Sequence, residues 1–241
     1  MRVAANLSIL FTEVPLLQRY ARAAAAGFKL VEVSFPYGES AKHLRDAADR
    51  HGLQHVLINA AVGSGRGGGR VRADSQLQKV RLGVKLQTPV QKFKLDYLLR
   101  IHVMAGIPLS EEDKAKADQT FLESISYAAE RLRQDNIMCL IEPVNPISIP
   151  GYYLNNYDQA LDILDTVKAP NLFIQFDFFH AEQIEGGIPK DIETWKGRIG
   201  HIQVAQAPDR GPPDSEGTID YAHWFRWMKA SGRDWIIGAE F

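Results

Sequence analysis

The chain has 241 residues, of which 45% are hydrophobic, so it is long enough to bury a large core. Its 28 basic and 29 acidic residues nearly cancel, which removes the electrostatic case for nucleic acid or an anionic membrane surface as the main partner. The single cysteine, Cys139, excludes an internal disulfide framework, and no apolar run approaches the roughly 18 residues of a membrane helix. We therefore expect a soluble, cytoplasmic protein with a small-molecule partner.

Short apolar runs alternate with amphipathic segments along most of the chain, in the order typical of βα units around a parallel sheet. We predict eight strands, at residues 2–8, 30–35, 55–60, 99–105, 138–143, 172–177, 201–206 and 235–240. Helical patterns lie between them, at residues 13–27, 39–52, 110–136, 157–168, 189–197 and 220–231. Because no Gly-rich dinucleotide fingerprint follows the first strand, this alternation predicts a single α/β domain over residues 1–241 with the (β/α)8 TIM-barrel fold.

Residues 62–98 interrupt the alternation at the place of the third helix. The segment opens with a Gly-rich tract and carries eight basic residues against two acidic ones. A basic loop for nucleic acid or phosphate is one interpretation. The segment has few aromatic residues and no recognition module, which favours an irregular insert, so we expect no nucleic-acid partner.

Polar residues end several of the predicted strands. Because side chains alternate along a strand, the apolar residues that share a face with Glu142 fill lower barrel layers, and Glu142 itself reaches the rim. The same parity brings Asp177, Gln203 and Glu240 to the rim from the next three strands. Three carboxylates so close together would repel one another, and a divalent cation would offset that repulsion. The four oxygen donors favour Mg²⁺ or Mn²⁺, although any one of the acids could instead be a helix N-cap or a surface charge.

Other polar residues near strand ends are candidates for the rim: Asn6, Glu32, Asn59, His102, His180 and Arg210. We weigh His102 equally as a histidine that is satisfied in the core or supports a site residue, and as a substrate contact. We expect His180 on an exposed loop after the sixth strand, close to a ligand. Arg210 lies in a Pro-rich loop, where it could clamp a substrate carboxylate or be a solvated charge. His201, two residues before Gln203, is expected in a lower layer.

Eight short motifs follow one another along the chain: ANLSILF, GFKLVEVSFPY, VLINA, IHVMAG, LIEPVNP, QFDFFH, GHIQVAQ and GAEF. In this order, over residues 2–61 and 99–241, they resemble the hydroxypyruvate isomerase family within the xylose isomerase-like barrels. The resemblance implies a metal-dependent isomerase that interconverts the keto acid hydroxypyruvate and 2-hydroxy-3-oxopropanoate (tartronate semialdehyde) by proton transfer through an enediolate.

The resemblance also implies roles for individual residues. Glu142 and Glu240 correspond to the acid and base of the family, and the metal set carries over to Glu142, Asp177, Gln203 and Glu240. His180 and Arg210 could bind the remaining substrate oxygens and the carboxylate. We keep His102 and Asn59 as further candidate substrate-binding residues.

The chain departs from that family in two places. Residues 62–98 lack the acidic loop and amphipathic third helix, and the eighth helix that follows the last motif in the family is missing after Phe241. We therefore expect an exposed apolar patch beside the eighth strand, low thermal stability and low activity. Two alternatives stay open: a non-catalytic truncated isoform with a metal-binding or interaction role, and a related sugar or keto-acid epimerase, which would normally carry a histidine in place of Gln203. The oligomeric state is not predicted.

Overall fold

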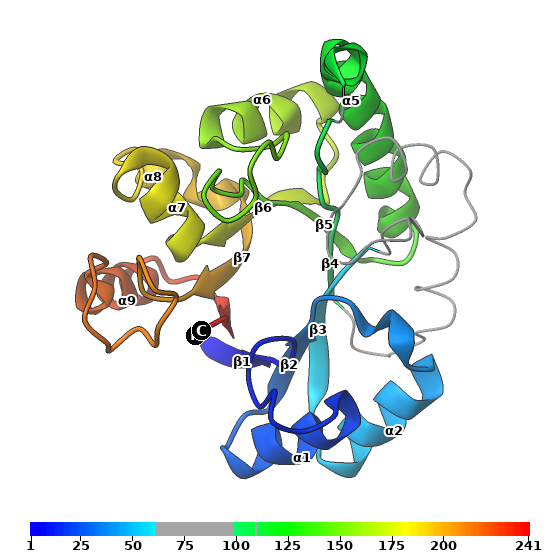
Figure 1. Cartoon of the computed structure of the whole chain (residues 1–241), viewed down its shortest axis with the longest axis vertical. Coiled ribbons are helices and arrows are strands. Elements are labelled where there is room, and N and C mark those ends of the chain that lie inside the picture. Colours follow the sequence, from blue (N-terminus) through cyan, green and yellow to red (C-terminus); the bar gives the residue numbers. More distant parts are fainter. Residues whose placement is uncertain (61–98, 109) are drawn as a thin grey trace.

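Eight parallel strands close into a barrel in chain order, as the computed structural model of the chain shows (Figure 1). The structure describes residues 1–60, 99–108 and 110–241, so the insert predicted at 62–98 lies outside the described residues. The strands are β1 (Arg2–Asn6), β2 (Leu30–Val33), β3 (Gln54–Asn59), β4 (Arg100–His102), β5 (Met138–Ile141), β6 (Leu172–Asp177), β7 (Ile199–Val204) and β8 (Ile236–Ala239). The predicted TIM-barrel fold is confirmed, with each strand within a few residues of its expected position.

Helices surround the barrel between consecutive strands (Figure 1). In the described residues they are α1 (Leu16–Ala25), α2 (Ala41–Arg50), α5 (Glu111–Arg133), α6 (Tyr157–Val167), α7 (Phe178–Glu185), α8 (Ile192–Trp195) and α9 (Tyr221–Ala230), with short 3-10 turns η1 (Pro36–Gly38) and η2 (Lys196–Arg198). The structure corrects one prediction, because α7 occupies residues expected to form a loop. No helix in the described part of the chain is both long and apolar enough to cross a membrane.

Two kinds of apolar core hold the barrel together. The larger core lies between the outer faces of the strands and the helices, as expected for βα units. A smaller cluster fills the lower interior of the barrel and includes Ala4, Leu30, Leu140 and Ile236. Leu140 lies two residues before Glu142 on the same strand face, so the cluster forms the floor beneath the polar side chains.

Strand register determines which polar residues share a level inside the barrel. Asp177 of β6 pairs with Gln203 of β7, and Gln203 pairs with Gly238 of β8. On the opposite side, Asn6 pairs with Glu32, and Glu32 pairs with Leu57. Glu32 therefore lies level with Leu57, two positions before Asn59, which is the last residue of β3.

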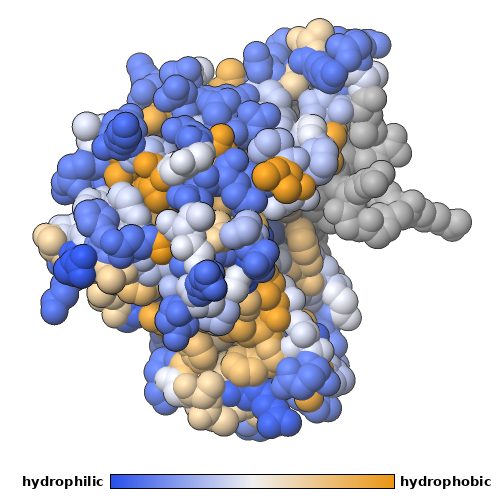
Figure 2. All heavy atoms as spheres, turned by 60° about the vertical axis from the view of Figure 1, so that its left-hand side comes forward, coloured by the Kyte–Doolittle hydropathy of each residue, from blue (hydrophilic) through white to orange (hydrophobic). Residues whose placement is uncertain are grey.

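The outer face of β8 and β1 carries an apolar groove of about 720 Å³, lined by residues that include Val3, Phe28, Phe225, Ile237 and Phe241. Val3 is 48% exposed there. Figure 2 shows a hollow of hydrophobic side chains between the part of the molecule that carries α9 and the part that carries α1. The predicted apolar patch beside the eighth strand is thus present.

Candidate active site

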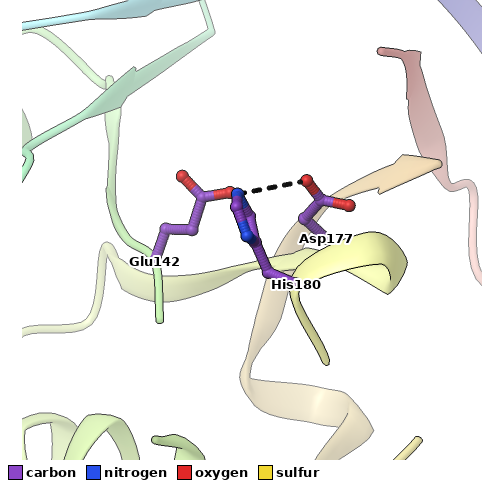
Figure 3. Close-up of side chains that lie close together, drawn as sticks. All are labelled: Glu142, Asp177 and His180. Atoms are coloured by element: carbon purple, nitrogen blue, oxygen red, sulfur yellow. Dashed lines mark ion pairs between the residues drawn. The ribbon is translucent and has the colours of Figure 1, made fainter. Parts of the chain in front are cut away.

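The predicted acidic side chains converge at the mouth of the barrel. Glu142 directly follows β5, Asp177 is the last residue of β6, and Glu240 directly follows β8. Figure 3 shows Glu142 and Asp177 pointing toward each other, with the His180 ring from α7 between them. One possible ligand atom from each of these three residues lies within 4.8 Å of the others. The parity of the strands therefore predicted the position of the acids correctly.

The site holds more negative charge than its surroundings neutralise. Glu142 is 7% exposed. Burial, and then the nearby charge of Asp177, raise the pKa of Glu142 from 4.5 to about 8. Burial also raises the pKa of Glu240 well above its ordinary value, although the positive charge of Arg210 opposes this shift. Protons or a cation must therefore accompany these carboxylates at neutral pH.

Arg210 reaches into the site from the loop after β7. Its Nη2 lies 3.2 Å from Glu240 Oε1 and 3.4 Å from Asp177 Oδ2, and its guanidinium lies 4.6 Å from the centre of the Phe179 ring. Burial lowers the pKa of Arg210, but the charges of Asp177, Glu240 and Glu142 outweigh it and raise the pKa overall. The alternative that Arg210 is a solvated loop charge is wrong, and its contacts leave it beside the carboxylates that a substrate would approach.

Gln206 organises the loop that carries Arg210. Its side-chain oxygen accepts hydrogen bonds from the backbone N–H groups of Ala207 at 3.0 Å and Ile219 at 2.9 Å. Its backbone N–H donates to the carbonyl of Gly211 at 2.7 Å. Sequence reasoning missed Gln206, although it ends the motif GHIQVAQ, because a glutamine after a strand resembles any surface amide.

His180 lies in the first turn of α7 and is buried, so the prediction of an exposed loop position is wrong. The helix begins here because Asp177 Oδ1 accepts the backbone N–H of Phe179 at 2.9 Å, as an N-cap does. The other oxygen, Asp177 Oδ2, faces the site and lies 3.7 Å from His180 Nε2. Asp177 therefore caps α7 and also faces the candidate site, whereas these had been predicted as alternatives.

Asn145 contacts the opposite nitrogen of the His180 ring. Its side-chain Nδ2 lies 2.8 Å from His180 Nδ1, and both residues are buried. Burial lowers the pKa of His180 to about 4, so the ring is neutral at physiological pH. Sequence reasoning did not single out Asn145, although a polar residue three positions after Glu142 in LIEPVNP was a usable signal.

His102 and Asn59 lie side by side at the ends of β4 and β3, where they are register partners. His102 is 1% exposed, and its Nδ1 lies 3.4 Å from Glu142 Oε2. Burial, and then the charges of His180 and His201, lower the pKa of His102 to about 3. Neither ring nitrogen makes a hydrogen bond to another described residue, and the contact with Glu142 suits a histidine that supports this acid as well as one that contacts substrate, so both interpretations stay predictions. A bound ligand or water beside Glu142 would supply the missing partner.

A buried polar layer lies directly below the mouth. Glu32 is at its centre: Oε1 lies 2.6 Å from His201 Nε2, while Oε2 accepts from Gln203 Nε2 at 3.0 Å and from Asn6 Nδ2 at 3.4 Å. Asn6 and Glu32 were expected at the rim, and that prediction is wrong, because the stagger of the strands sets them level with Leu57 rather than with Asn59. The prediction that His201 occupies a lower layer is confirmed.

Gly238 leaves room for the Glu32 carboxylate. A Cβ atom at position 238 would lie 2.2 Å from Glu32 Oε1, a distance that no real contact shows. With Glu32 in place, the Gln203 amide donates downward, and its Oε1 accepts from Gln175 Nε2 at 2.7 Å. The amide of Gln203 therefore has a fixed orientation next to Asp177.

The residues at the mouth fit a divalent cation. The buried group of Glu142, Asp177 and His180 could hold a metal ion, and the excess negative charge around it is the environment that such an ion stabilises. The sequence predicted a different fourfold set, Glu142, Asp177, Gln203 and Glu240. The two sets share Glu142 and Asp177, and the group in the structure adds His180 but does not include Gln203 or Glu240.

Comparison with known proteins identifies the family. A family model described as xylose isomerase-like TIM barrel matches residues 20–241. The chain belongs to the xylose isomerase-like TIM barrel family. A member of 48% identity over 240 residues is named putative hydroxypyruvate isomerase, from Caenorhabditis elegans; the match covers 100% of this chain and 92% of the relative. Another, 37% identical over 240 residues with the same coverage, is named 2-oxo-tetronate isomerase, from Cupriavidus necator.

Solved structures show the same fold. A crystal structure titled AP endonuclease, family 2, from Brucella melitensis superposes with a TM-score of 0.84 at 33% identity, covering 100% of this chain and 92% of the other. Proteins similar to this chain thus carry the names of isomerases and of an endonuclease. The residues of the site must decide between these reaction classes.

Proposed function

We propose that this protein is an isomerase that interconverts hydroxypyruvate and 2-hydroxy-3-oxopropanoate. The observation that carries the proposal is the pair of carboxylates, buried Glu142 and partly exposed Glu240, on either side of Asp177 at the barrel mouth. The name of the Caenorhabditis elegans relative supports this substrate, and a short keto acid with one carboxylate suits the guanidinium of Arg210.

The reaction moves a carbonyl group by one carbon. A base removes a proton from the hydroxymethyl carbon, which gives an enediolate, and an acid returns a proton to the neighbouring carbon, while a hydroxyl proton moves between the two oxygens. Glu142 and Glu240 divide the two carbon steps, one removing and the other returning a proton. Burial, which raises the pKa of Glu142, makes its carboxylate a stronger base than one in water, and this suits the removal of a carbon-bound proton.

Other residues bind and orient the substrate. Arg210 is proposed to bind the substrate carboxylate through two parallel hydrogen bonds from its planar guanidinium. The adjacent Phe179 ring and the loop that Gln206 supports hold the guanidinium in place. His180 faces the reacting oxygens. His102 and Asn59 are proposed to contact the substrate from β4 and β3, since the unpartnered nitrogens of His102 need hydrogen bonds. Burial of the site excludes water from the enediolate.

A divalent cation, Mg²⁺ or Mn²⁺, is proposed to be held by Glu142, Asp177, Gln203 and Glu240. When bound, it would supply Lewis-acid polarisation of the substrate carbonyl and stabilise negative charge on the oxygens, which contributes several kcal/mol in enzymes of this kind. The same ion would reduce the repulsion that raises the pKa of Glu142.

The alternatives fit the site less well. An endonuclease would need further histidine and carboxylate ligands for zinc, whereas within residues 1–60, 99–108 and 110–241 the acid and histidine side chains form one possible metal group. A sugar epimerase would normally carry a histidine at the position of Gln203, which here is an amide held by Glu32 and Gln175. The assay below distinguishes a non-catalytic metal-binding or interaction role from these enzymatic functions.

The deciding assay measures turnover of hydroxypyruvate by the purified chain with added Mg²⁺ or Mn²⁺, and again after a chelator. We expect chelator-sensitive turnover that Glu142→Gln abolishes. Glu123→Gln is the matched control, because it makes the same carboxylate-to-amide exchange on the exposed face of α5 and should leave turnover unchanged. A folded protein without turnover under any of these conditions would support the non-catalytic alternative.

A further inference from the structure

The side-chain amide of Asn145 has one possible orientation in this structure. Its oxygen accepts the backbone N–H of Ser148 at 2.7 Å. Its nitrogen therefore faces His180 Nδ1, 2.8 Å away. Turning the amide over would set its NH₂ group against the N–H of Ser148, so that two donors would face each other.

This orientation determines which nitrogen of His180 carries the proton. Nδ1 faces the Asn145 NH₂ group, and the backbone N–H of Asn145 also points at it from 3.4 Å. Since both neighbours are donors, Nδ1 is the acceptor and carries no proton. In a neutral imidazole the hydrogen is then on Nε2. The imidazolium form would also carry a hydrogen on Nδ1, which would then face the two donor groups of Asn145.

The protonated nitrogen faces the centre of the site. Nε2 lies 3.7 Å from Asp177 Oδ2, and the ring lies between Asp177 and Glu142 (Figure 3). A histidine ligates a metal through an unprotonated nitrogen, and the one such nitrogen of His180 is turned away toward Asn145. An N–H group in this position would repel a cation but would bind an oxygen that carries negative charge.

We propose that Asn145 is a positioning residue that holds His180 as the Nε2–H tautomer, so that His180 donates a hydrogen bond to a substrate oxygen and is not a ligand of the cation. The cation then depends on the four proposed oxygen ligands, Asp177 among them, without His180. The substrate role of His180 rests on the isomerase function proposed above, whereas its tautomer and its independence from the cation do not.

The first test measures Mn²⁺ affinity by calorimetric titration of the full chain. His180→Leu cannot ligate a metal, and we expect its dissociation constant to stay within about threefold of wild type. Asp177→Asn is the matched comparison, because asparagine keeps the N-cap of α7 while the site loses a charged ligand; its affinity should fall by at least about tenfold. Loss of affinity in His180→Leu as large as that in Asp177→Asn would overturn the proposal.

The second test reads the tautomer directly by long-range ¹H–¹⁵N correlation on protein labelled in histidine, with the His180 ring assigned as the one missing from His180→Leu. We expect a single Nε2–H form in wild type. Asn145→Leu removes the side-chain donor and should give a mixed population, with kcat about tenfold or more lower and Mn²⁺ affinity nearly unchanged. Asn155→Leu, in the same loop but exposed, should leave the tautomer as in wild type.

The proposal is overturned if wild type has the Nδ1–H or imidazolium form at neutral pH, or if Asn145→Leu retains the pure Nε2–H form. Should Asn145→Leu fail to fold, the wild-type tautomer and the His180→Leu titration still decide the matter. Neither measurement requires turnover, so a protein that binds Mn²⁺ with the expected tautomer and yet leaves hydroxypyruvate unchanged would refute the proposed substrate alone.

Discussion

Gly238→Ala should destabilise the protein strongly, because the Glu32 carboxylate fills the space beside residue 238. The new Cβ would lie 2.2 Å from Glu32 Oε1 and 2.7 Å from Oε2, so the carboxylate must move by about 1 Å to restore an ordinary contact. That movement breaks the 2.6 Å contact with His201 or the 3.0 Å hydrogen bond from Gln203. One lost hydrogen bond to a charged group costs about 1.5–3 kcal/mol, and interior overpacking adds about 1–3 kcal/mol.

We therefore expect the free energy of unfolding to fall by about 3–5 kcal/mol, a large fraction of the typical total. The measurement is urea unfolding followed by tryptophan fluorescence, and the melting temperature should fall by about 10 °C. Gly197→Ala is the matched control, since its Cβ would lie 3.9 Å from Arg233 Nη1, an ordinary contact, and its stability should change by less than about 0.5 kcal/mol.

A double-mutant cycle isolates the contact. In a Glu32→Ala background the carboxylate is gone, so Gly238→Ala should cost at least about 1 kcal/mol less than it does in wild type. The reasoning is refuted if Gly238→Ala is as stable as Gly197→Ala, or if its cost is the same in both backgrounds.

Three further results are expected. The stability of the metal-free protein should fall as the pH rises from about 6.5 to about 8, because the folded state keeps the Glu142 proton, with its raised pKa, more tightly than the unfolded chain does. Below about pH 6.5 the buried His102 and His180, whose pKa values are lowered, contribute the opposite slope. Thermal melts should show the fall above about pH 6.5, and Glu142→Gln should reduce it. Arg210→Lys keeps the charge but loses the planar fork, so KM for hydroxypyruvate should rise by about tenfold with Mn²⁺ affinity little changed, and an unchanged KM would argue against the clamp. Gln206→Leu leaves two backbone N–H groups without their acceptor, so steady-state kinetics should show a higher KM and melts a lower stability; normal values for both would contradict the role of Gln206.

The sequence predicted the barrel and its acidic mouth because both depend on local rules. Alternation along a strand is a property of the backbone, so the position of Glu142 two residues beyond Leu140 followed without knowledge of the neighbours. The motif LIEPVNP, together with the other motifs, indicated the hydroxypyruvate isomerase family. The same rule failed for Glu32, since its height depends on how β2 is staggered against β1 and β3, and stagger is a relation between strands that one strand does not encode.

The supporting residues could not be predicted for a related reason. Asn145 contacts His180 on a different element, and Gln206 holds the backbone of the loop that follows it, and neither contact belongs to a periodic pattern. His180 was assigned to a loop because α7 begins directly after Asp177, with no loop between strand and helix, and an acid at a strand end can cap a helix while it faces the candidate site. The sequence thus predicted which acidic residues meet at the barrel mouth, whereas their orientation required the assembled barrel.

Isomerisation in D₂O tests the central claim most directly. If Glu142 and Glu240 transfer protons through an enediolate, the 2-hydroxy-3-oxopropanoate formed from hydroxypyruvate in the presence of Mg²⁺ should carry deuterium at the carbon that receives the proton, as NMR would detect. Glu142→Gln and Glu240→Gln should each abolish this product. Product formed without deuterium would contradict proton transfer through solvent-exchanging carboxylates, and product formed at the wild-type rate by either variant would contradict the assigned pair.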